Sequence, residues 1–382
     1  MKLIPYGRHY IDTPDVRSIH KVLRNDIITG GSKVNEFEKK ISSYLKCKYS
    51  VACNSGTSAL FLAMQSIGLK KNDIVIMPSI NFIASYNIAK LFNAKIYLAD
   101  VDSHTGQMTP KSVVECCTKY KLQKVKAIIV MYNGGFPENA QNFYKFKKKL
   151  NCFLIEDACH ALGAAYKFKN NHYKIGSCKH ADISTFSLHP LKTITTAEGG
   201  IITTNSNKIF KKLKILRSVG MEKEKNKHWV YDVKSISLNF RLNEIQSALG
   251  ISQLKKIKLF ISKRKKIYNI YKSELKNISG LSMPEYSKNY FPSFHLCLAI
   301  LERDNLKFKE KFIKFMLKKN IMIQYHYIPI YKFSIFNEKY IGKNAEKYYK
   351  NAISLPVYYK LEHKQQYQII NHIKSFFLTN CN

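Results

Sequence analysis

The stretch Ser184-Thr-Phe-Ser-Leu-His-Pro-Leu-Lys192, followed by Thr195-Thr-Ala-Glu-Gly-Gly-Ile-Ile-Thr-Thr-Asn205, is the most informative part of the chain. Two β-rich runs, 183–186 and 200–203, flank a turn that contains one lysine, Lys192. Its neighbours are apolar or hydroxylated rather than charged, so partial desolvation would lower its pKa and favour the neutral amine that forms Schiff bases. An ordinary solvated lysine is the alternative, and this segment alone does not decide between them.

Similar β-rich runs alternate with helical patterns from about residue 45 to residue 205. The further runs are 49–53, 74–77, 95–98, 127–131 and 152–156. This alternation predicts an α/β fold whose mainly parallel sheet has helices on both faces. A long helix is expected from Asn243 to about Leu275.

We therefore expect four parts along the chain. They are an N-terminal segment that contributes to the active site (1–30), a large α/β domain (31–240), a connecting long helix (241–281) and a small C-terminal α+β domain (282–382).

The charge of the chain is strongly positive, with 63 Lys and Arg against 26 Asp and Glu and a formal net charge of +37. Such an excess suits nucleic acids or acidic membranes. However, the lysines recur at helical spacing between apolar residues, as on solvated helix faces. We expect an anionic small-molecule substrate rather than nucleic acid or a membrane, and a basic nucleic-acid-binding or regulatory protein is the alternative from another functional class.

The nine cysteines form no CxxC pair and no Cys/His spacing typical of a metal site. Reduced thiols in a cytoplasmic protein without a metal are therefore expected. The N-terminus lacks an apolar signal core, and no apolar run is long enough to span a membrane.

The segment Asn54-Ser-Gly-Thr-Ser-Ala-Leu60 follows the first β-rich run and opens a helical pattern. Backbone N–H groups, the hydroxyls of Ser55, Thr57 and Ser58, and the positive end of the helix would converge there. This arrangement favours a bound phosphate. A helix N-cap after a tight glycine turn is the simpler alternative.

The segment Ile155-Glu-Asp-Ala-Cys-His-Ala-Leu-Gly163 places two acids and a histidine where another β-rich run ends. Ligands bind at that edge in open α/β sheets. Asp157 is better placed than Glu156, whose side chain should point to the opposite face. A buried carboxylate needs a cationic partner, which the protonated ring nitrogen of pyridoxal phosphate would supply. His160 could equally be an ordinary core histidine.

Phe82, in Pro78-Ser-Ile-Asn-Phe82, follows the run 74–77 and could stack on a planar ring, although a lone phenylalanine is more often part of a core. Four features thus follow one another at strand ends of one predicted sheet. They are a phosphate-binding segment (54–60), an aromatic ring that could stack on a cofactor (Phe82), a carboxylate that could pair with a pyridinium nitrogen (Asp157) and a lysine (Lys192). In combination they predict a fold-type I pyridoxal-phosphate enzyme, similar to aspartate aminotransferase, with a large domain and a smaller C-terminal one.

Five segments resemble the sugar-nucleotide aminotransferases of the DegT/DnrJ/StrS family, and the resemblance spans nearly the whole chain. They are residues 54–60, 156–163, 186–192, 198–200 and 238–250. Within the family, the chain is most similar to the branch of the pseudaminic acid pathway. That similarity lies in residues 4–8, 102–106, 193–200, 239–255 and 324–327. Enzymes of this branch aminate C4 of a UDP-linked 4-keto-6-deoxy-N-acetylhexosamine, usually with L-glutamate as donor.

The resemblance implies a role for individual residues. Lys192 would hold pyridoxal phosphate covalently and Asp157 would pair with its ring nitrogen, which makes these two the expected catalytic residues. The other residues expected to bind the cofactor are Gly56, Thr57, Phe82, His160, Ser187 and Asn239. The residues expected to contact the nucleotide sugar are Tyr6, Asp26, Ile27, Ile28, Thr29, His189, Arg241, Gln324, Tyr325, His326 and Tyr327.

In similar enzymes the counterpart of Asn239 reaches the cofactor phosphate of the neighbouring subunit, which implies a homodimer with shared active sites. Related 4-aminotransferases of the perosamine or viosamine type, or a 3-aminotransferase, are the alternatives within the family. The segment Tyr132-Asn-Gly-Gly-Phe-Pro137 departs from the family pattern, in which an Ala-Gly-containing turn is common. Substrate preference near this loop is therefore open.

Overall fold

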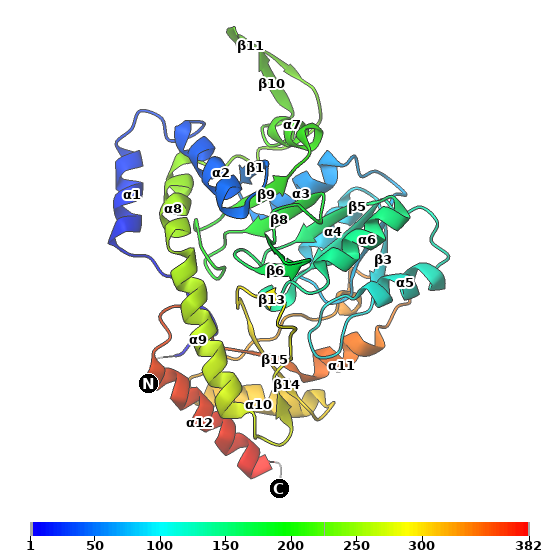
Figure 1. The fold of residues 1–382 in the computed structure, drawn as a ribbon, viewed down its shortest axis with the longest axis vertical. Helices are drawn as coiled ribbons and strands as arrows, with labels where there is room; N and C mark the ends of the chain where they lie inside the picture. The colour runs from blue at the N-terminus through cyan, green and yellow to red at the C-terminus, as the bar shows by residue number, and fades with distance from the viewer. Residues whose placement is uncertain (1–2, 225, 381–382) are drawn as a thin grey trace.

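In the computed structural model, which describes residues 3–224 and 226–380, a seven-stranded sheet forms the centre of the molecule (Figure 1). The strand order is β1-β9-β8-β5-β4-β2-β3, and β9 runs antiparallel to both of its neighbours while the other pairs are parallel. The strands are β1 (Tyr49–Cys53), β2 (Ile74–Pro78), β3 (Lys95–Ala99), β4 (Ala127–Met131), β5 (Phe153–Asp157), β8 (Ile183–Ser187) and β9 (Gly200–Thr204). They match the predicted runs to within one residue, and the α/β fold is confirmed.

Helices cover both faces of the sheet because successive strand side chains point to opposite sides. Ala52, Ile76 and Ile128 pack in the layer that contains α2, α5, α6 and α8. Their neighbours Val51 and Ile129 pack in the layer of α3, α4 and α7. The helices of the two layers are α2 (Ser32–Leu45), α3 (Gly56–Ser66), α4 (Ala84–Leu91), α5 (Pro110–Lys119), α6 (Ala140–Leu150), α7 (Asn207–Leu216) and α8 (Glu244–Lys255).

A second core lies at the C-terminal end of the molecule. A three-stranded sheet, in the order β12-β14-β15, packs against α9, α10 and α12. Ile4, near the N-terminus, pairs with Ile321 and is buried in the same core. The elements are α9 (Ile257–Leu275), β12 (Leu281–Ser282), β14 (Cys297–Leu301), α10 (Leu306–Lys318), α11 (Lys343–Asn351), β15 (Ala352–Leu355) and α12 (His363–Asn380).

The expected single helix from Asn243 to Leu275 is two helices, α8 and α9, which meet at Lys256. The N–H group of Lys256 bonds the carbonyls of Gln253 and Leu254, which is a tighter turn than an α-helix makes. No glycine or proline marks this position, so the hydrophobic pattern gave no signal of the break.

Small elements complete the fold. Strands β13 (Tyr290–Phe291), β6 (Ala165–Phe168) and β7 (Asn171–Lys174) form a three-stranded sheet in that order. Helix α1 (Thr13–Leu23) packs against α8. Strands β10 (Met221–Glu224) and β11 (Lys227–Val233) form a hairpin that projects from the body of the molecule (Figure 1). None of the helices in the described ranges has the length and hydropathy that crossing a membrane requires.

Candidate active site

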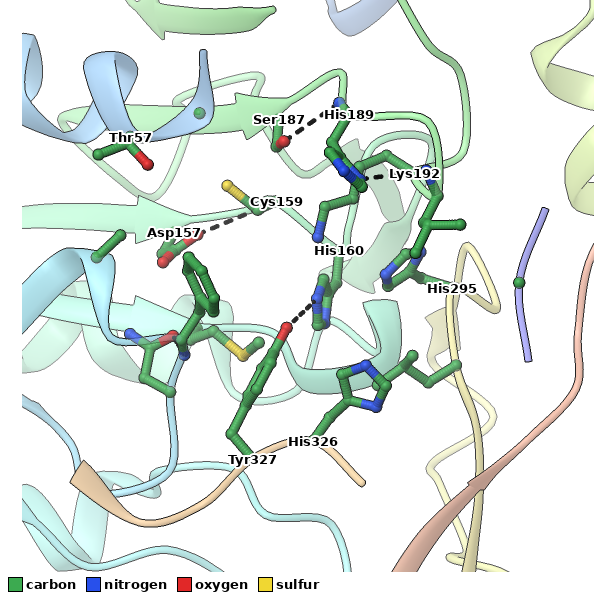
Figure 2. A pocket seen from close by; sticks show the side chains of 18 of the residues that line it. Thr57, Asp157, Cys159, His160, Ser187, His189, Lys192, His295, His326 and Tyr327 are labelled. Carbon is green, nitrogen blue, oxygen red and sulfur yellow. Dashed lines mark hydrogen bonds between the residues drawn. The ribbon is translucent and has the colours of Figure 1, made fainter. Parts of the chain in front are cut away.

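A cavity of about 440 Å³ lies where β1, β2, β4, β5 and β8 end at their carboxyl ends (Figure 2). This volume falls in the range of small-molecule sites. The lining includes Tyr6, Gly56, Thr57, Phe82, Asp157, His160, Ser187, His189, Lys192, His326 and Tyr327 among the residues singled out from the sequence. Segments far apart in the chain thus meet in one pocket.

Lys192 lies in the turn that leads from β8 back to β9, and its side chain projects into the pocket beside Asp157 and His160 (Figure 2). Its backbone N–H donates to the carbonyl of His189 (2.9 Å), and the N–H of Thr196 donates to Leu188 (3.0 Å). Burial lowers the pKa of Lys192, although Cys159 and Asp157 act in the opposite direction. The amine is therefore neutral more often than that of a surface lysine at the same pH.

Asp157 is the last residue of β5 and is buried at the pocket wall. Its Oδ2 accepts a hydrogen bond from the hydroxyl of Ser85 (3.1 Å), and its Oδ1 accepts one from the N–H of Cys159 (3.4 Å). Glu156 points to the other face of the sheet, where it accepts hydrogen bonds from Tyr132 and Ser184. One carboxylate, that of Asp157, is thus fixed in the site with capacity to accept a further hydrogen bond.

The N-terminus of α3 opens toward the pocket. Ser55 caps the helix by accepting a hydrogen bond from the N–H of Ser58 (3.0 Å). A Cβ atom at Gly56 would lie 2.7 Å from the Cβ of Ser187, so only glycine lets the helix end approach β8 this closely. The exposed side chain of Thr57 and the hydroxyl of Ser187 border the same space. Free N–H groups, two hydroxyls and the positive helix end suit a phosphate.

One wall of the pocket near Lys192 contains the rings of His160, His295, His326 and Tyr327 (Figure 2). The hydroxyl of Tyr327 and Nε2 of His160 share a hydrogen bond of 2.8 Å, and the ring of His295 lies 4.2 Å from that of His160. Burial lowers the pKa of His160 and His295 far below the ordinary value, and that of His326 to about 3. These imidazoles are therefore neutral at physiological pH.

His295 was missed by the sequence analysis. It lies between β13 and β14, more than 100 residues after Lys192 and outside every motif that carries a predicted site residue. A histidine just ahead of the apolar run Cys297–Leu301 is the only signal in the sequence. Nδ1 of His160 and Nδ1 of His295 are buried and have no hydrogen-bond partner among the described residues. Both residues also line the cavity, and buried polar atoms are usually hydrogen-bonded.

Phe82 is 54% exposed and lines the pocket, with its ring 5.9 Å from the ring of Tyr327. The other predicted residues do not line the cavity. Asp26, Ile27, Ile28 and Thr29 lie between α1 and α2, where the carbonyl of Ile28 accepts from Glu244. Asn239 and Arg241 are exposed next to the end of β1. Gln324 and Tyr325 directly precede His326 but do not line the cavity.

The donor set fits pyridoxal phosphate. One cavity is surrounded by a lysine with a lowered pKa, a buried carboxylate, a phosphate-sized cradle at a helix end, and the buried imidazole of His160, whose Nδ1 has no partner among the described residues. Among the described residues, no group of three or more His, Cys, Asp or Glu could hold a metal ion.

Comparisons with known proteins agree with this geometry. Residues 9–374 match the model of the DegT/DnrJ/EryC1/StrS aminotransferase family. The chain is 35% identical over 369 residues to UDP-4-amino-4,6-dideoxy-N-acetyl-beta-L-altrosamine transaminase of Campylobacter jejuni, covering 95% of this chain and 94% of the relative. It is 30% identical to GDP-perosamine synthase of Escherichia coli O157:H7, covering 99% of both chains.

Among solved structures, the fold is similar to that of Helicobacter pylori PseC, an aminotransferase of pseudaminic acid biosynthesis. The TM-score is 0.91 at 30% identity, with 99% of this chain and 100% of the other covered.

Proposed function

The chain belongs to the DegT/DnrJ/EryC1/StrS aminotransferase family, and from this premise we propose that it transfers the amino group of L-glutamate to C4 of a UDP-linked 4-keto-6-deoxy-N-acetylhexosamine. The observation that carries the proposal is the pocket in which Lys192, Asp157 and the N-terminus of α3 meet. The similarity to the altrosamine transaminase and to the pseudaminic acid enzyme supports the substrate class.

The cofactor of this reaction is pyridoxal phosphate. When bound, it supplies a protonated ring that withdraws electrons from the carbon that loses a proton. We assign Lys192 as its covalent anchor, because burial favours the neutral, nucleophilic form of this amine. The amine of Lys192 would also carry a proton to and from the reacting carbon.

Asp157 would hold the ring nitrogen in its protonated state, since a carboxylate at a buried position favours a cationic partner. Ser85 and the N–H of Cys159 fix the orientation of this carboxylate. Gly56, Thr57 and Ser187 would hold the phosphate at the end of α3. His160, which lines the same cavity, would contact the cofactor.

The nucleotide sugar would occupy the side of the pocket formed by Tyr6, His326 and Tyr327. Among the described lining residues, Lys192 is the only lysine or arginine, which is too little positive charge for a diphosphate. A second copy of the chain would complete the site. The projecting hairpin supports this, because it exposes lysines together with apolar side chains that suit an interface, including Tyr231 (57% exposed) and Val233 (57% exposed).

The proposal is tested by product analysis. The purified enzyme is given L-glutamate and UDP-linked 4-ketosugars of both configurations at C5, and the stereochemistry at C4 of the product is determined by NMR. We expect one UDP-linked ketosugar to be aminated at C4. Because the perosamine synthase is 30% identical to this chain, a GDP-linked 4-ketosugar is offered in parallel. Amination of the GDP-linked sugar alone would contradict the assignment.

A further inference from the structure

The loop from Tyr132 to Pro137, which departs from the family pattern, packs directly behind the active site. It follows β4 and is buried, and both of its glycines adopt positive φ angles (69° and 84°). A Cβ atom at Gly135 would lie 2.0 Å from Oγ of Ser293 and 2.5 Å from the carbonyl oxygen of His160. The loop therefore approaches the backbone of His160 more closely than any other residue type would allow.

The same loop holds the segment that carries His295. The N–H of Ser293 donates to the carbonyl of Gly135 (3.1 Å), and the N–H of Leu296 donates to that of Gly134 (3.3 Å). The hydroxyl of Ser293 donates to the carbonyl of His160 (2.6 Å). His160 and His295 are thus fixed to one another through the loop.

Asn133 begins a directed chain of hydrogen bonds toward the substrate side of the pocket. Its Nδ2 donates to the carbonyl of Thr105 (3.0 Å) and to the hydroxyl of Tyr348 (2.8 Å). The Tyr348 hydroxyl then donates to the carbonyl of His326 (2.8 Å). An amide NH₂ group can only donate, so the single proton of Tyr348 is directed to His326. Asn133 and Tyr348 are both fully buried, with exposures of 0% and 1%.

The His326 carbonyl, which accepts the hydrogen bond from Tyr348, belongs to the peptide that joins His326 to Tyr327. Both side chains line the cavity, and the Tyr327 hydroxyl bonds His160 (Figure 2). Without Tyr348, the carbonyl would be a buried acceptor lacking its partner, which costs more than a lost surface hydrogen bond. The peptide would turn to relieve this, and both rings would move with it.

We propose that Asn133 and Tyr348 are positioning residues that set the geometry of the substrate-side wall through the His326–Tyr327 peptide. The inference rests on the proposed function, in which His326 and Tyr327 face the nucleotide sugar. Neither residue lines the cavity, so both act through His326. The loop that departs from the family pattern would thus influence recognition of the sugar through Asn133.

The test separates the two half-reactions. Tyr348→Phe keeps the ring and removes the hydroxyl, and Asn133→Asp replaces the donor with an acceptor that draws the Tyr348 proton away from His326. We expect KM for the UDP-linked ketosugar to rise about tenfold in each variant, whereas the rate of the glutamate half-reaction changes by less than about twofold. Tyr271→Phe is the matched control, since it removes a buried hydroxyl of the second core that has no hydrogen-bond partner among the described residues. It should leave both values unchanged.

A binding measurement distinguishes failure of this inference from failure of the proposed function. UDP-N-acetylglucosamine, a nucleotide sugar that has no ketone, is titrated calorimetrically into wild type and variants. We expect about tenfold weaker binding in Tyr348→Phe and Asn133→Asp. Wild-type binding without amination of any UDP-linked ketosugar would overturn the proposed function alone. Folded variants that bind the probe as wild type does, or that lose both half-reactions equally, would overturn the positioning role.

Discussion

At the scale of single residues, two side chains of opposite charge, Lys192 and Asp157, define the site. Desolvation lowers the pKa of Lys192, so its neutral form, the form able to react, becomes more populated as the pH rises through that lowered value. Asp157 lies beside it at the end of β5 and keeps its orientation through Ser85. In the proposed reaction, Asp157 pairs with the ring nitrogen of the cofactor, whereas Lys192 anchors the cofactor covalently.

Asp157→Asn removes the negative charge and keeps the size of the side chain. We expect kcat to fall by roughly 10²–10³, because a fixed charge that stabilises a developing charge contributes effects of this order. Steady-state transamination with glutamate checks it. The matched control is Glu156→Gln on the opposite face of the same strand, whose kcat should stay near that of wild type. Equal losses of kcat in both variants would show that damage to the strand, and not loss of the charge in the site, lowers the activity.

At the scale of elements, the ends of the strands place the site, and these ends could be predicted. The β-rich runs gave strand positions within one residue, and side-chain alternation separated Asp157 from Glu156. The break at Lys256 and the hairpin β10–β11 could not be predicted. At the break, Lys256 contacts Asp15 of α1, a residue far away in the sequence. The hairpin shows no buried face among its described side chains that could impose a pattern.

Lys256 joins α1 to the junction of α8 and α9. Its Nζ lies 2.5 Å from Oδ2 of Asp15, whose side chain is fully buried, and 2.7 Å from Oδ1 of Asp12. Lys256→Ala should lower the free energy of unfolding by about 3 kcal/mol, because the buried carboxylate of Asp15 loses its cationic partner and keeps only neutral donors such as Nε2 of Gln253. Chemical denaturation measures this. The exposed neighbour Lys255 provides the control, and a loss of similar size in Lys255→Ala would contradict the explanation.

Lys309 of α10 is buried between the rings of Tyr325 and Tyr349, each 4.5 Å from its Nζ, and donates to the carbonyl of Tyr349. Burial lowers its pKa from 10.5 to about 7. Below pH 7 both the folded and the unfolded state bind the proton. Above pH 7 only the unfolded state does, so this residue makes the protein more stable as the pH rises toward 10.5.

We therefore expect the free energy of unfolding of wild type to rise between pH 7 and pH 9 by on the order of 2 kcal/mol more than that of Lys309→Met. Urea denaturation of both proteins at these two pH values gives the two changes in free energy of unfolding. The contributions of other titrating groups cancel when one change is subtracted from the other. Parallel pH profiles would contradict a buried, neutral Lys309.

At the scale of the whole molecule, the net charge of +37 contrasts with a pocket in which Lys192 is the only lysine or arginine among the described lining residues. The positive charge lies on helix faces and on the hairpin, which projects from the end of the molecule opposite α12 (Figure 1). This distribution suits an enzyme whose anionic substrate is held between two copies. The dimer itself stays a prediction, as do the roles assigned to Asn239 and Arg241.

Two acidic substitutions on the hairpin, Tyr231→Glu with Val233→Glu, should weaken the dimer by roughly 30-fold or more, since loss of an apolar anchor costs about 2 kcal/mol. Transamination should fall with the dimer if the active sites are shared. Sedimentation equilibrium measures the association. Leu378→Glu on α12, which is 71% exposed, is the control at the other end of the molecule. A monomeric wild type with full activity would contradict shared sites.

The candidate site could be predicted only in part. Motifs next to predicted strand ends identified Lys192, Asp157, Gly56 and Ser187, and the structure brings these together in one cavity. His295 and the Asn133–Tyr348 chain could not be found in this way, because they act through contacts between segments with no shared pattern. The position of residues 26–29 outside the cavity was likewise not evident, since it depends on how the segment between α1 and α2 packs.

Of the proposed roles, that of Lys192 as the covalent anchor of the cofactor can be tested most directly. The protein is reconstituted with pyridoxal phosphate, reduced with borohydride, digested and mapped by mass spectrometry, with Lys309 as an internal comparison because its pKa is also lowered. We predict that the pyridoxyl modification is found on the peptide that contains Lys192 and that Lys192→Arg abolishes it. Stoichiometric modification of Lys309 or another lysine, with Lys192 unmodified, would contradict the claim.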